Sequence, residues 1–233
     1  MKSCYKIILV ISLILNVVLL ASALCYFMSK RDYSCQAKHQ PSECLRNDKE
    51  CVMSWNNCIK QLNMQFDVVF FGDSHTAYGQ FQAAFPEINS INLGYMGEDT
   101  KGMLRRVEVI QSVSPRKVFL MAGLNGLSDQ SSSEFKSAYC TLIDSILSAV
   151  PDAELYIENI LPVNDDVDLN RKIIDANRII QQIAGERNLT YIDVYSLYVV
   201  NSELPQDVTN DGVHLKAEAY SLWYASLRPY LTH

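Results

Sequence analysis

The sequence lacks the basic character of a nucleic-acid-binding protein. No run of lysine or arginine occurs in its 233 residues, and 26 acidic side chains outnumber 20 basic ones, for a net charge of −6. Binding to a phosphate backbone needs a basic face. The composition therefore argues against a nucleic-acid partner. Charged residues make up an ordinary 20% of the chain, which gives no indication of a disordered protein.

Internal repeats and low-complexity linkers are also missing, so neither a repeat protein nor a string of loosely joined modules is indicated. The length suits one α/β domain with a substantial core. We predict three parts: a membrane anchor or signal peptide at residues 1–29, a helical, cysteine-rich connector at 30–65, and a folded domain at 66–233.

The first part contains a long uncharged stretch. From Ile7 to Met28 no residue is charged, over about 22 residues, and a helix needs about 20 apolar residues to span a bilayer. The apolar region of a cleaved signal peptide is usually only about 7–15 residues long. The length favours a retained transmembrane helix. The small residues Ala21, Ser22 and Ala23 leave cleavage, and hence secretion, as the alternative.

Four of the seven cysteines follow this stretch closely: Cys35, Cys44, Cys51 and Cys58. An even number of cysteines in a short segment suggests disulfides, which persist outside the cytosol. We therefore expect a single-pass protein of the cell membrane whose domain is periplasmic or extracellular. Reduced cysteines in a cytosolic stalk are the alternative. The cysteine spacings are too wide for a paired-thiolate zinc site.

The connector carries an apolar stripe typical of a helix. After a helix start at Ser42, the residues Leu45, Val52, Ile59 and Phe66 recur every seven positions. This stripe predicts packing either on the folded domain or on a second copy of the chain, which would make a homodimer.

Three of the cysteines share the same seven-residue period. Positions seven apart in one straight helix are separated by about 10.5 Å, beyond the roughly 7 Å limit for a disulfide. In a continuous helix Cys44, Cys51 and Cys58 would therefore pair with Cys35 or with a second chain. A turn near Asn47 would instead allow pairing of Cys44 with Cys51 and of Cys35 with Cys58.

Short apolar runs alternate with helical patterns in the rest of the chain. Strands are expected at residues 68–71, 91–93, 118–121, 155–157 and 191–194, and helices near 100–113, 132–150, 170–187 and 216–227, the last ending before Pro229. This alternation predicts a parallel sheet covered by helices on both faces. Ligands of such sheets bind at the carboxyl ends of the strands, and Ser74, Gly94 and Asn125 all follow strand ends.

Two short motifs supply the groups of a nucleophilic site. Ser74 follows the first strand in Gly-Asp-Ser-His, and Asp211 and His214 belong to Asp-Gly-Val-His near the C-terminus. Serine needs a neighbouring imidazole to take its proton, and the imidazole needs an acceptor to hold its tautomer. Either motif alone could be a turn or a helix cap, but together they indicate a Ser-His-Asp triad.

The remaining candidates fit the chemistry less well. The other histidines are His39 in the connector, the terminal His233, and His75, which is adjacent to Ser74 on a sharp turn and is expected to point elsewhere. Cys140 lies in a helical pattern and is expected in the core. Structural charges are expected at Glu108, Glu158 and Asp193.

Four segments resemble the conserved blocks of the SGNH/GDSL hydrolase superfamily, in the same order and at normal spacing. They begin at Gly72, Asn92, Gly123 and Asp211 and read Gly-Asp-Ser, Asn-Leu-Gly-Tyr-Met-Gly-Glu-Asp-Thr, Gly-Leu-Asn-Gly and Asp-Gly-Val-His-Leu. The resemblance covers residues 67–231. It implies a three-layer, flavodoxin-like α/β/α sandwich with a five-stranded parallel sheet, and hydrolysis of lipid, carbohydrate or thioester acyl groups.

The resemblance also implies residue roles. Ser74 is the nucleophile, His214 the base and Asp211 its partner. The oxyanion is held by the backbone N–H groups of Ser74 and Gly97 and by the side-chain amide of Asn125. Neither cofactor nor metal is expected.

The chain departs from the family pattern at two positions. His75 replaces the leucine of Gly-Asp-Ser-Leu, at a position that is variable among related sequences, so the triad is unaffected. Gly126 replaces the usual aspartate of the third block, which bears on rate or substrate preference.

Three substrate hypotheses remain open. The domain has no long apolar lid, which suits a small acyl group and an O-acetylesterase acting on carbohydrate. The overall pattern of strands, including Leu161-Pro162-Val163-Asn164 after the fourth strand, resembles bacterial members of the superfamily that are often assigned to deacetylation of glycans. A membrane anchor would suit a lysophospholipase or thioesterase, with an acyl groove lined by apolar side chains. That groove would be formed by Phe81, Phe85, Met96 and Met103. A catalytically silent glycan-binding module would lack a triad member or have a blocked oxyanion site.

Overall fold

Five short strands form one parallel sheet at the centre of the fold. The computed structural model describes the backbone of residues 49–231 and the side chains of residues 54–61 and 63–231. The strands run in the order β2-β1-β3-β4-β5, and their bounds are β1 Val68–Gly72, β2 Ser90–Asn92, β3 Lys117–Met121, β4 Glu154–Glu158 and β5 Thr190–Ile192. The predicted α/β fold with a five-stranded parallel sheet is confirmed.

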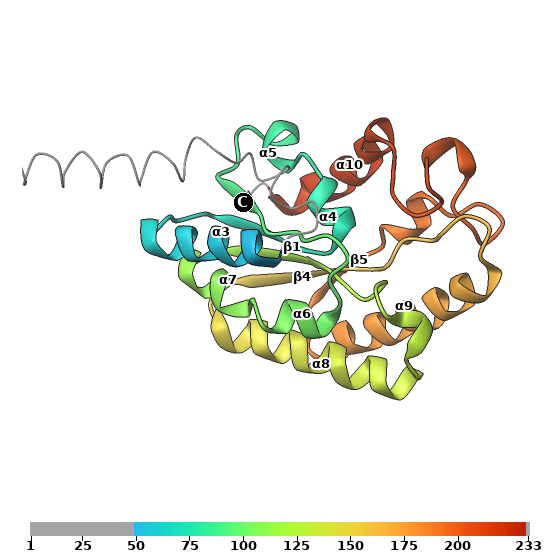
Figure 1. Cartoon of the computed structure of the whole chain (residues 1–233), viewed down its shortest axis with the longest axis horizontal. Coiled ribbons are helices and arrows are strands. Elements are labelled where there is room, and N and C mark those ends of the chain that lie inside the picture. The colour runs from blue at the N-terminus through green and yellow to red at the C-terminus, as the bar shows by residue number, and fades with distance from the viewer. Residues whose placement is uncertain (1–48, 232–233) are drawn as a thin grey trace, which may run out of the picture. The chain divides into compact units, whose positions relative to one another are not determined.

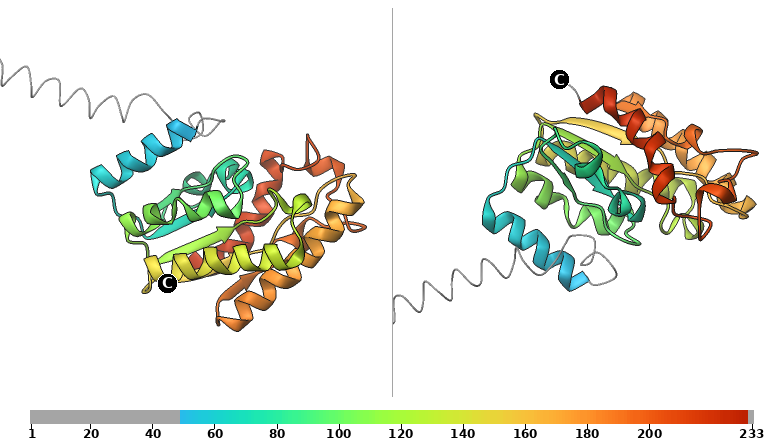
Figure 2. Two further views of the ribbon diagram at one scale, coloured as in Figure 1. Left: turned by 60° about the horizontal axis from the view of Figure 1, so that its bottom comes forward. Right: turned by 90° about the horizontal axis from the view of Figure 1, so that it is seen from above.

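Helices cover both faces of this sheet (Figure 1). The helices are α3 Lys49–Leu62, α4 Ser74–Tyr78, α5 Phe81–Ala84, α6 Thr100–Leu104, α7 Val107–Val113, α8 Ser132–Ala149, α9 Val167–Glu186 and α10 Tyr220–Leu231. Short 3-10 turns η1 to η4 occupy Leu127–Asp129, Tyr195–Leu197, Gln206–Val208 and Ala217–Ala219. Figure 2 shows α10 on the opposite side of the sheet from α8 and α9.

The apolar side chains of the strands pack into two separate cores, because successive side chains point to opposite faces of a sheet. Val69 and Phe71 pack toward α6, α7, α8 and α9 in one core. Val68 and Phe70 pack toward α5 and α10 in the other. Burial on both faces explains why β1 and β3 consist of uninterrupted buried positions.

Helix α3 packs on the domain through part of the predicted stripe. Ile59 is fully buried in the core, α3 packs beside α7, and Phe66 packs against the same core, as does the neighbouring Trp55. The prediction that the stripe faces the domain is therefore confirmed for Ile59 and Phe66. Among the described residues, no helix has the length and apolar character needed to cross a membrane.

Several predictions for the N-terminal part fall outside the described residues. These are the anchor at 1–29, the helix start at Ser42, and the side chains of Cys35, Cys44 and Cys51. Cys58 is buried on α3. The pairing of these cysteines, and the boundary between residues 65 and 66, stay predictions.

The prediction of one continuous helix at residues 100–113 is wrong, because the structure has two helices there, α6 and α7. The backbone leaves the helical geometry at Arg106, with φ −110° and ψ 1°. The Arg106 side chain turns inward there and forms a buried ion pair with Glu98. A contact of this kind, between two polar side chains eight residues apart, leaves no mark on the local apolar periodicity.

Two other boundaries differ from the prediction. The final helix does not stop before Pro229 but continues to Leu231. Proline removes one hydrogen bond from a helix, but the buried side chains of Leu227 and Leu231 anchor the last turn to the core. Strand β5 ends at Ile192 rather than Val194, because the Asp193 carboxylate accepts hydrogen bonds from Ser196 and starts the turn η2.

A buried carboxyl group on β4 makes the stability of the fold depend on pH. Glu158 is 2% exposed and accepts a hydrogen bond from the indole of Trp223. Burial raises the pKa of Glu158 from 4.5 to about 8, and the indole hydrogen bond only partly offsets this effect. Between these two values the folded state binds more protons than the unfolded state, so the free energy of unfolding falls as pH rises.

We expect Glu158→Gln to remove this part of the pH dependence. Denaturant titrations at pH 5 and pH 8 measure it as the change in the free energy of unfolding. The wild type should lose stability between the two values, and Glu158→Gln should lose less. Glu218→Gln, at an exposed position, serves as the matched control. Equal losses in the wild type and in Glu158→Gln would contradict the assignment.

Candidate active site

Ser74 stands at the turn between the first strand and the next helix. Strand β1 ends at Gly72, Asp73 caps α4, and Ser74 is the first residue of that helix. The Asp73 carboxylate accepts a hydrogen bond of 3.0 Å from the backbone N–H of His75, as short polar side chains do at helix N-termini. This cap fixes the backbone on both sides of Ser74, which is 5% exposed.

The loop before α10 carries the other two triad residues. One Asp211 carboxylate oxygen accepts backbone hydrogen bonds from Val213 at 3.0 Å and from His214 at 2.8 Å. The Thr209 hydroxyl donates to the carbonyl of His214 at 2.7 Å and accepts from the Gly212 N–H at 3.1 Å. The loop therefore holds the carboxylate and the imidazole in a fixed relative position.

The structure brings the three predicted residues into one chain of contacts. His214 Nε2 is 2.8 Å from Ser74 Oγ, and His214 Nδ1 is 2.6 Å from the second oxygen of Asp211. A carboxylate accepts and does not donate when ionised, so Nδ1 carries the proton and Nε2 faces the serine as an acceptor. This is the arrangement in which an imidazole removes a proton from a serine hydroxyl.

The charge state of Asp211 suits its place beside His214. Partial burial disfavours its ionisation, but hydrogen bonds from the His214 ring and from two backbone N–H groups outweigh this effect. Together they hold the pKa of Asp211 well below its usual range. The carboxylate is therefore ionised at neutral pH and stabilises the imidazolium that proton transfer creates.

Gly97 and Asn125, two of the three predicted oxyanion residues, lie on loops that contact each other. The Asn125 side-chain amide donates to the carbonyl of Glu98 at 3.0 Å, directly after Gly97. Gly97 has φ +67°, and the space where its side chain would be is empty within 4 Å. Glycine adopts this left-handed conformation at little cost, so the backbone there is open to a ligand.

Gly126, which replaces the usual aspartate of the third block, also has a left-handed backbone. Its φ is +76°, and a side-chain carbon there would lie 3.3 Å from the Gln130 amide. Glycine at this position lets the chain turn directly from Asn125 into η1. The substitution therefore fits a tight turn and leaves the amide of Asn125 in place.

The buried ion pair between Arg106 and Glu98, the residue after Gly97, was not predicted from the sequence. Arg106 and Glu98 are 5% and 8% exposed, and Arg106 Nε donates to both carboxylate oxygens of Glu98 at 2.8 and 3.0 Å. Arg106 also donates to the carbonyl of Leu93 at 3.2 Å. The pair fixes both ends of the loop that carries Gly97. The sequence did not reveal this pairing, because Glu98 lies in the loop before the predicted helix and Arg106 lies eight residues later, inside it.

His75 does not contact the Ser74 side chain, which confirms the expectation that it points elsewhere. Its Nε2 lies 3.0 Å from the carbonyl of Val213. Burial disfavours protonation of the ring, but the Asp73 carboxylate and the Val213 carbonyl outweigh it and raise the pKa of His75. The other expected structural side chains include Glu158 in the core and Cys140, which is only half-buried.

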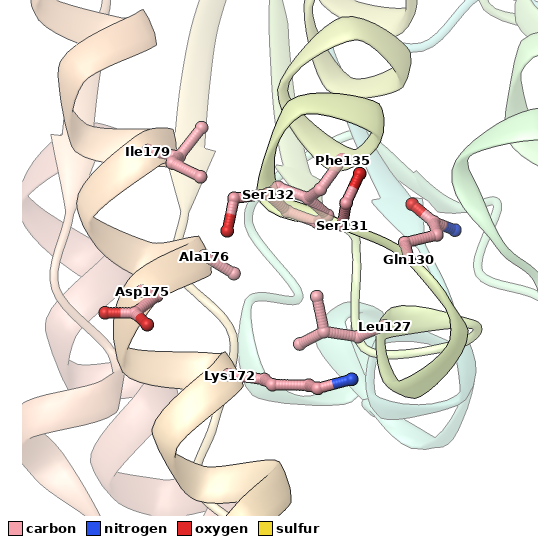
Figure 3. A pocket seen from close by; sticks show the side chains of 9 residues that line it. All are labelled: Leu127, Gln130, Ser131, Ser132, Phe135, Lys172, Asp175, Ala176 and Ile179. Atoms are coloured by element: carbon pink, nitrogen blue, oxygen red, sulfur yellow. The ribbon is translucent and has the colours of Figure 1, made fainter.

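A separate cavity has a volume of about 150 Å³, and Figure 3 shows the side chains that line it. It lies between η1, the start of α8 and one side of α9. Its walls include Leu127, Phe135 and Lys172, and no triad residue lines it. Within the described part of the chain, no group of three or more acidic, histidine or cysteine side chains could hold a metal ion.

Comparison with a known family identifies the chain. The model of the GDSL-like Lipase/Acylhydrolase family matches residues 70–222, a span that contains Ser74, Gly97, Asn125, Asp211 and His214. The chain belongs to this family. Its members' chemistry makes the protein a carboxylic ester hydrolase, as the triad geometry indicates. Among curated proteins, none matches the sequence of this GDSL-like hydrolase.

Solved structures share the fold of this GDSL-like hydrolase. A Streptococcus pneumonia protein provisionally assigned as a platelet activating factor is 24% identical, with TM-score 0.70, over 80% of this chain and 94% of that one. A GDSL-like lipase from Bacteroides thetaiotaomicron is 20% identical, with TM-score 0.63, over 73% and 89%. The acetylxylan esterase Axe2 from Geobacillus stearothermophilus is 18% identical, with TM-score 0.61, over 73% and 95%.

Proposed function

We propose that this GDSL-like hydrolase is a serine esterase that removes O-acetyl groups from carbohydrate outside the cytoplasm. The observation that carries the proposal is the contact chain from Ser74 through His214 to Asp211, with separations of 2.8 and 2.6 Å. The predicted membrane anchor and extracytoplasmic location belong to this proposal, as does a homodimer formed through the connector.

The reaction proceeds in two acyl-transfer steps. Ser74 Oγ attacks the ester carbonyl carbon while its proton passes to His214 Nε2, and the negative charge collects on the carbonyl oxygen. The C–O bond to the alcohol breaks, and the leaving alcohol takes the proton from His214. Water then attacks the acyl-serine, giving its proton to His214, and the carboxylic acid leaves as Ser74 recovers its proton.

Openness of the site supports a small acyl group and a bulky alcohol. The side chains of His214 and Asp211 are 27% and 54% exposed, so the leaving-group side of the triad is accessible. A long acyl chain would need an apolar groove, yet three of the four candidate groove residues lie in the cores. Phe81, Phe85 and Met103 are each at most 1% exposed. The shared fold with an acetylxylan esterase agrees with this preference.

The first experiment measures acid release from matched substrates by the full-length protein. Acetylated xylo-oligosaccharides and acetylated glycans are compared with lysophospholipids and long-chain acyl esters, with Ser74→Ala as the control. Ser74-dependent acetate release with little action on long chains is expected. Preference for long acyl chains would replace the proposal by a lysophospholipase or thioesterase. A protein inert toward all of these substrates would favour a glycan-binding module.

Asn125 is expected to contribute strongly to the rate. Its amide is the side-chain donor placed beside Gly97, and loss of one oxyanion donor typically lowers kcat by about 100- to 1000-fold. Steady-state kinetics of Asn125→Ala should show this fall with a small change in KM. Asn125→Asp keeps the shape of the side chain without its N–H donors and should be equally impaired. A kcat for Asn125→Ala within twofold of the wild type would contradict the role.

Tyr78 is expected to contact the alcohol part of the substrate. It is 44% exposed, and its ring centroid is 5.1 Å from that of His214 at an interplanar angle of 79°. The leaving alcohol collects its proton from His214, so a sugar would lie against this aromatic side chain. Tyr78→Ala should raise KM for acetylated oligosaccharides about 3- to 10-fold, with Tyr78→Phe unchanged. Triacetin, which has no sugar ring, should show no such increase.

A further inference from the structure

Asp73 and His75 form a second carboxylate–histidine pair, next to the pair of Asp211 and His214. The His75 ring is 1% exposed and its centroid is 5.4 Å from that of His214. His75 Nε2 is 3.0 Å from the carbonyl oxygen of Val213. A carbonyl only accepts hydrogen bonds, so Nε2 must carry the proton and donate it.

Asp73 and Tyr220 hold His75 itself in place. Its Nδ1 is 3.4 Å from the carboxylate of Asp73, which is also buried, and this contact is attractive when the ring carries a proton on both nitrogens. The same carboxylate accepts the backbone N–H of His75 at 3.0 Å. The hydroxyl of Tyr220 on α10 donates to the carbonyl of His75 at 2.8 Å. The ring is thus fixed relative to the nucleophile turn and cannot follow the Val213 loop if that loop moves.

The Val213 carbonyl, which accepts this hydrogen bond, lies in the backbone directly before His214. Val213 sits between Asp211 and His214, and its carbonyl is part of the peptide unit that begins His214. The carbonyl of Gly212 accepts from the N–H of Asn164 at 2.7 Å, which ties the loop to a different segment. His75 instead ties the loop directly to the residue next to Ser74.

We propose that His75 is a positioning residue that tethers the Asp211–His214 loop to the nucleophile turn and so sets the distance between His214 Nε2 and Ser74 Oγ. The inference rests on the proposed serine-esterase function and assigns a purpose to a histidine that takes no part in proton transfer. Misplacement of a catalytic group by about 1 Å can cost about 100-fold in rate. Loss of the tether should therefore lower kcat more than it raises KM.

Two amide side chains of different length provide matched variants. In His75→Gln the amide nitrogen reaches about as far as Nε2 and can still donate to Val213. In His75→Asn the amide ends near the position of Nδ1, so the side chain stays polar but cannot reach the carbonyl. We expect His75→Gln to keep kcat within about threefold of the wild type and His75→Asn to lose about 10- to 100-fold, with KM within about threefold in both.

The rate at which a fluorophosphonate phosphonylates Ser74 in the full-length protein gives a readout that needs no natural substrate. The reaction requires His214 Nε2 to take the proton of Ser74 Oγ, so its rate depends on the distance between these two atoms. The rate should be similar in the wild type and in His75→Gln and about 10- to 100-fold lower in His75→Asn, while circular dichroism shows that all three proteins are folded. His75→Leu, which removes the polar group, should behave like His75→Asn and replaces it if that variant does not fold.

The outcomes separate the tether from the proposed function. Equal kcat values and equal rates of Ser74 phosphonylation in His75→Gln and His75→Asn would overturn the tether, whatever the substrate. A wild type that is phosphonylated but hydrolyses no ester would overturn the proposed function, and the phosphonylation rates would still decide the tether: a selective fall in His75→Asn supports it, and an unchanged rate there refutes it.

Discussion

Replacement of Ser74 by alanine is expected to lower kcat by about 10⁴- to 10⁶-fold, because no other group can form the acyl-enzyme. Ser74 Oγ is the atom that faces His214 Nε2, at 2.8 Å. Its loss leaves the proposed oxyanion donors in place, so we expect KM to change little. Steady-state acetate release measures the fall in kcat, and circular dichroism verifies that the variant is folded.

Ser148→Ala is the matched control for this variant. Ser148 is an exposed serine on α8 and does not belong to the triad. Its replacement should leave kcat unchanged. Substantial esterase activity in Ser74→Ala would remove Ser74 from the role of nucleophile, and the whole assignment of the site would fail with it.

Asp211→Asn is expected to lower kcat by about 10⁴-fold while leaving the serine and the histidine in place. The carboxylate holds the proton on Nδ1 of His214, across 2.6 Å. An asparagine amide can donate to Nδ1 instead, which moves the ring proton to Nε2. In that tautomer Nε2 cannot take the proton of Ser74.

A nearby carboxylate supplies the control for Asp211→Asn. Asp207 is exposed in η3, in the segment that leads to the catalytic loop. Asp207→Asn should retain the wild-type kcat, which shows that the effect of Asp211→Asn is not a general effect of lost surface charge. A kcat for Asp211→Asn within tenfold of the wild type would show that Asp211 does not orient His214.

The central features of the fold could be predicted because short-range patterns in the sequence indicate them. The strands of the sheet are buried on both faces, so β1 and residues 118–121 of β3 consist of apolar residues and glycine only. Helix α8 begins with a capping box formed by Ser131 and Glu134, which is a local signal as well. A predicted boundary was wrong where a contact outside the local apolar pattern is made, as at Arg106, which pairs with the buried Glu98 at the break between α6 and α7.

The candidate site shows the same division between local and distant information. Ser74, Asp211 and His214 were found because each belongs to a short motif at a strand end or before a helix. The ion pair under Gly97 and the hydrogen bond from His75 to Val213 could not be found in this way. Each joins segments whose proximity exists only after folding, 138 residues apart in the case of His75 and Val213.

The most direct measurement of the central claim is the mass of the protein after reaction with a fluorophosphonate, which phosphonylates an activated serine and needs no knowledge of the natural substrate. The wild type should gain one adduct, located on Ser74 by peptide mapping. Asp211→Asn should react much more slowly and Ser74→Ala not at all. A wild type that gains no adduct, or gains it on another residue, would contradict the account of a Ser74–His214–Asp211 esterase.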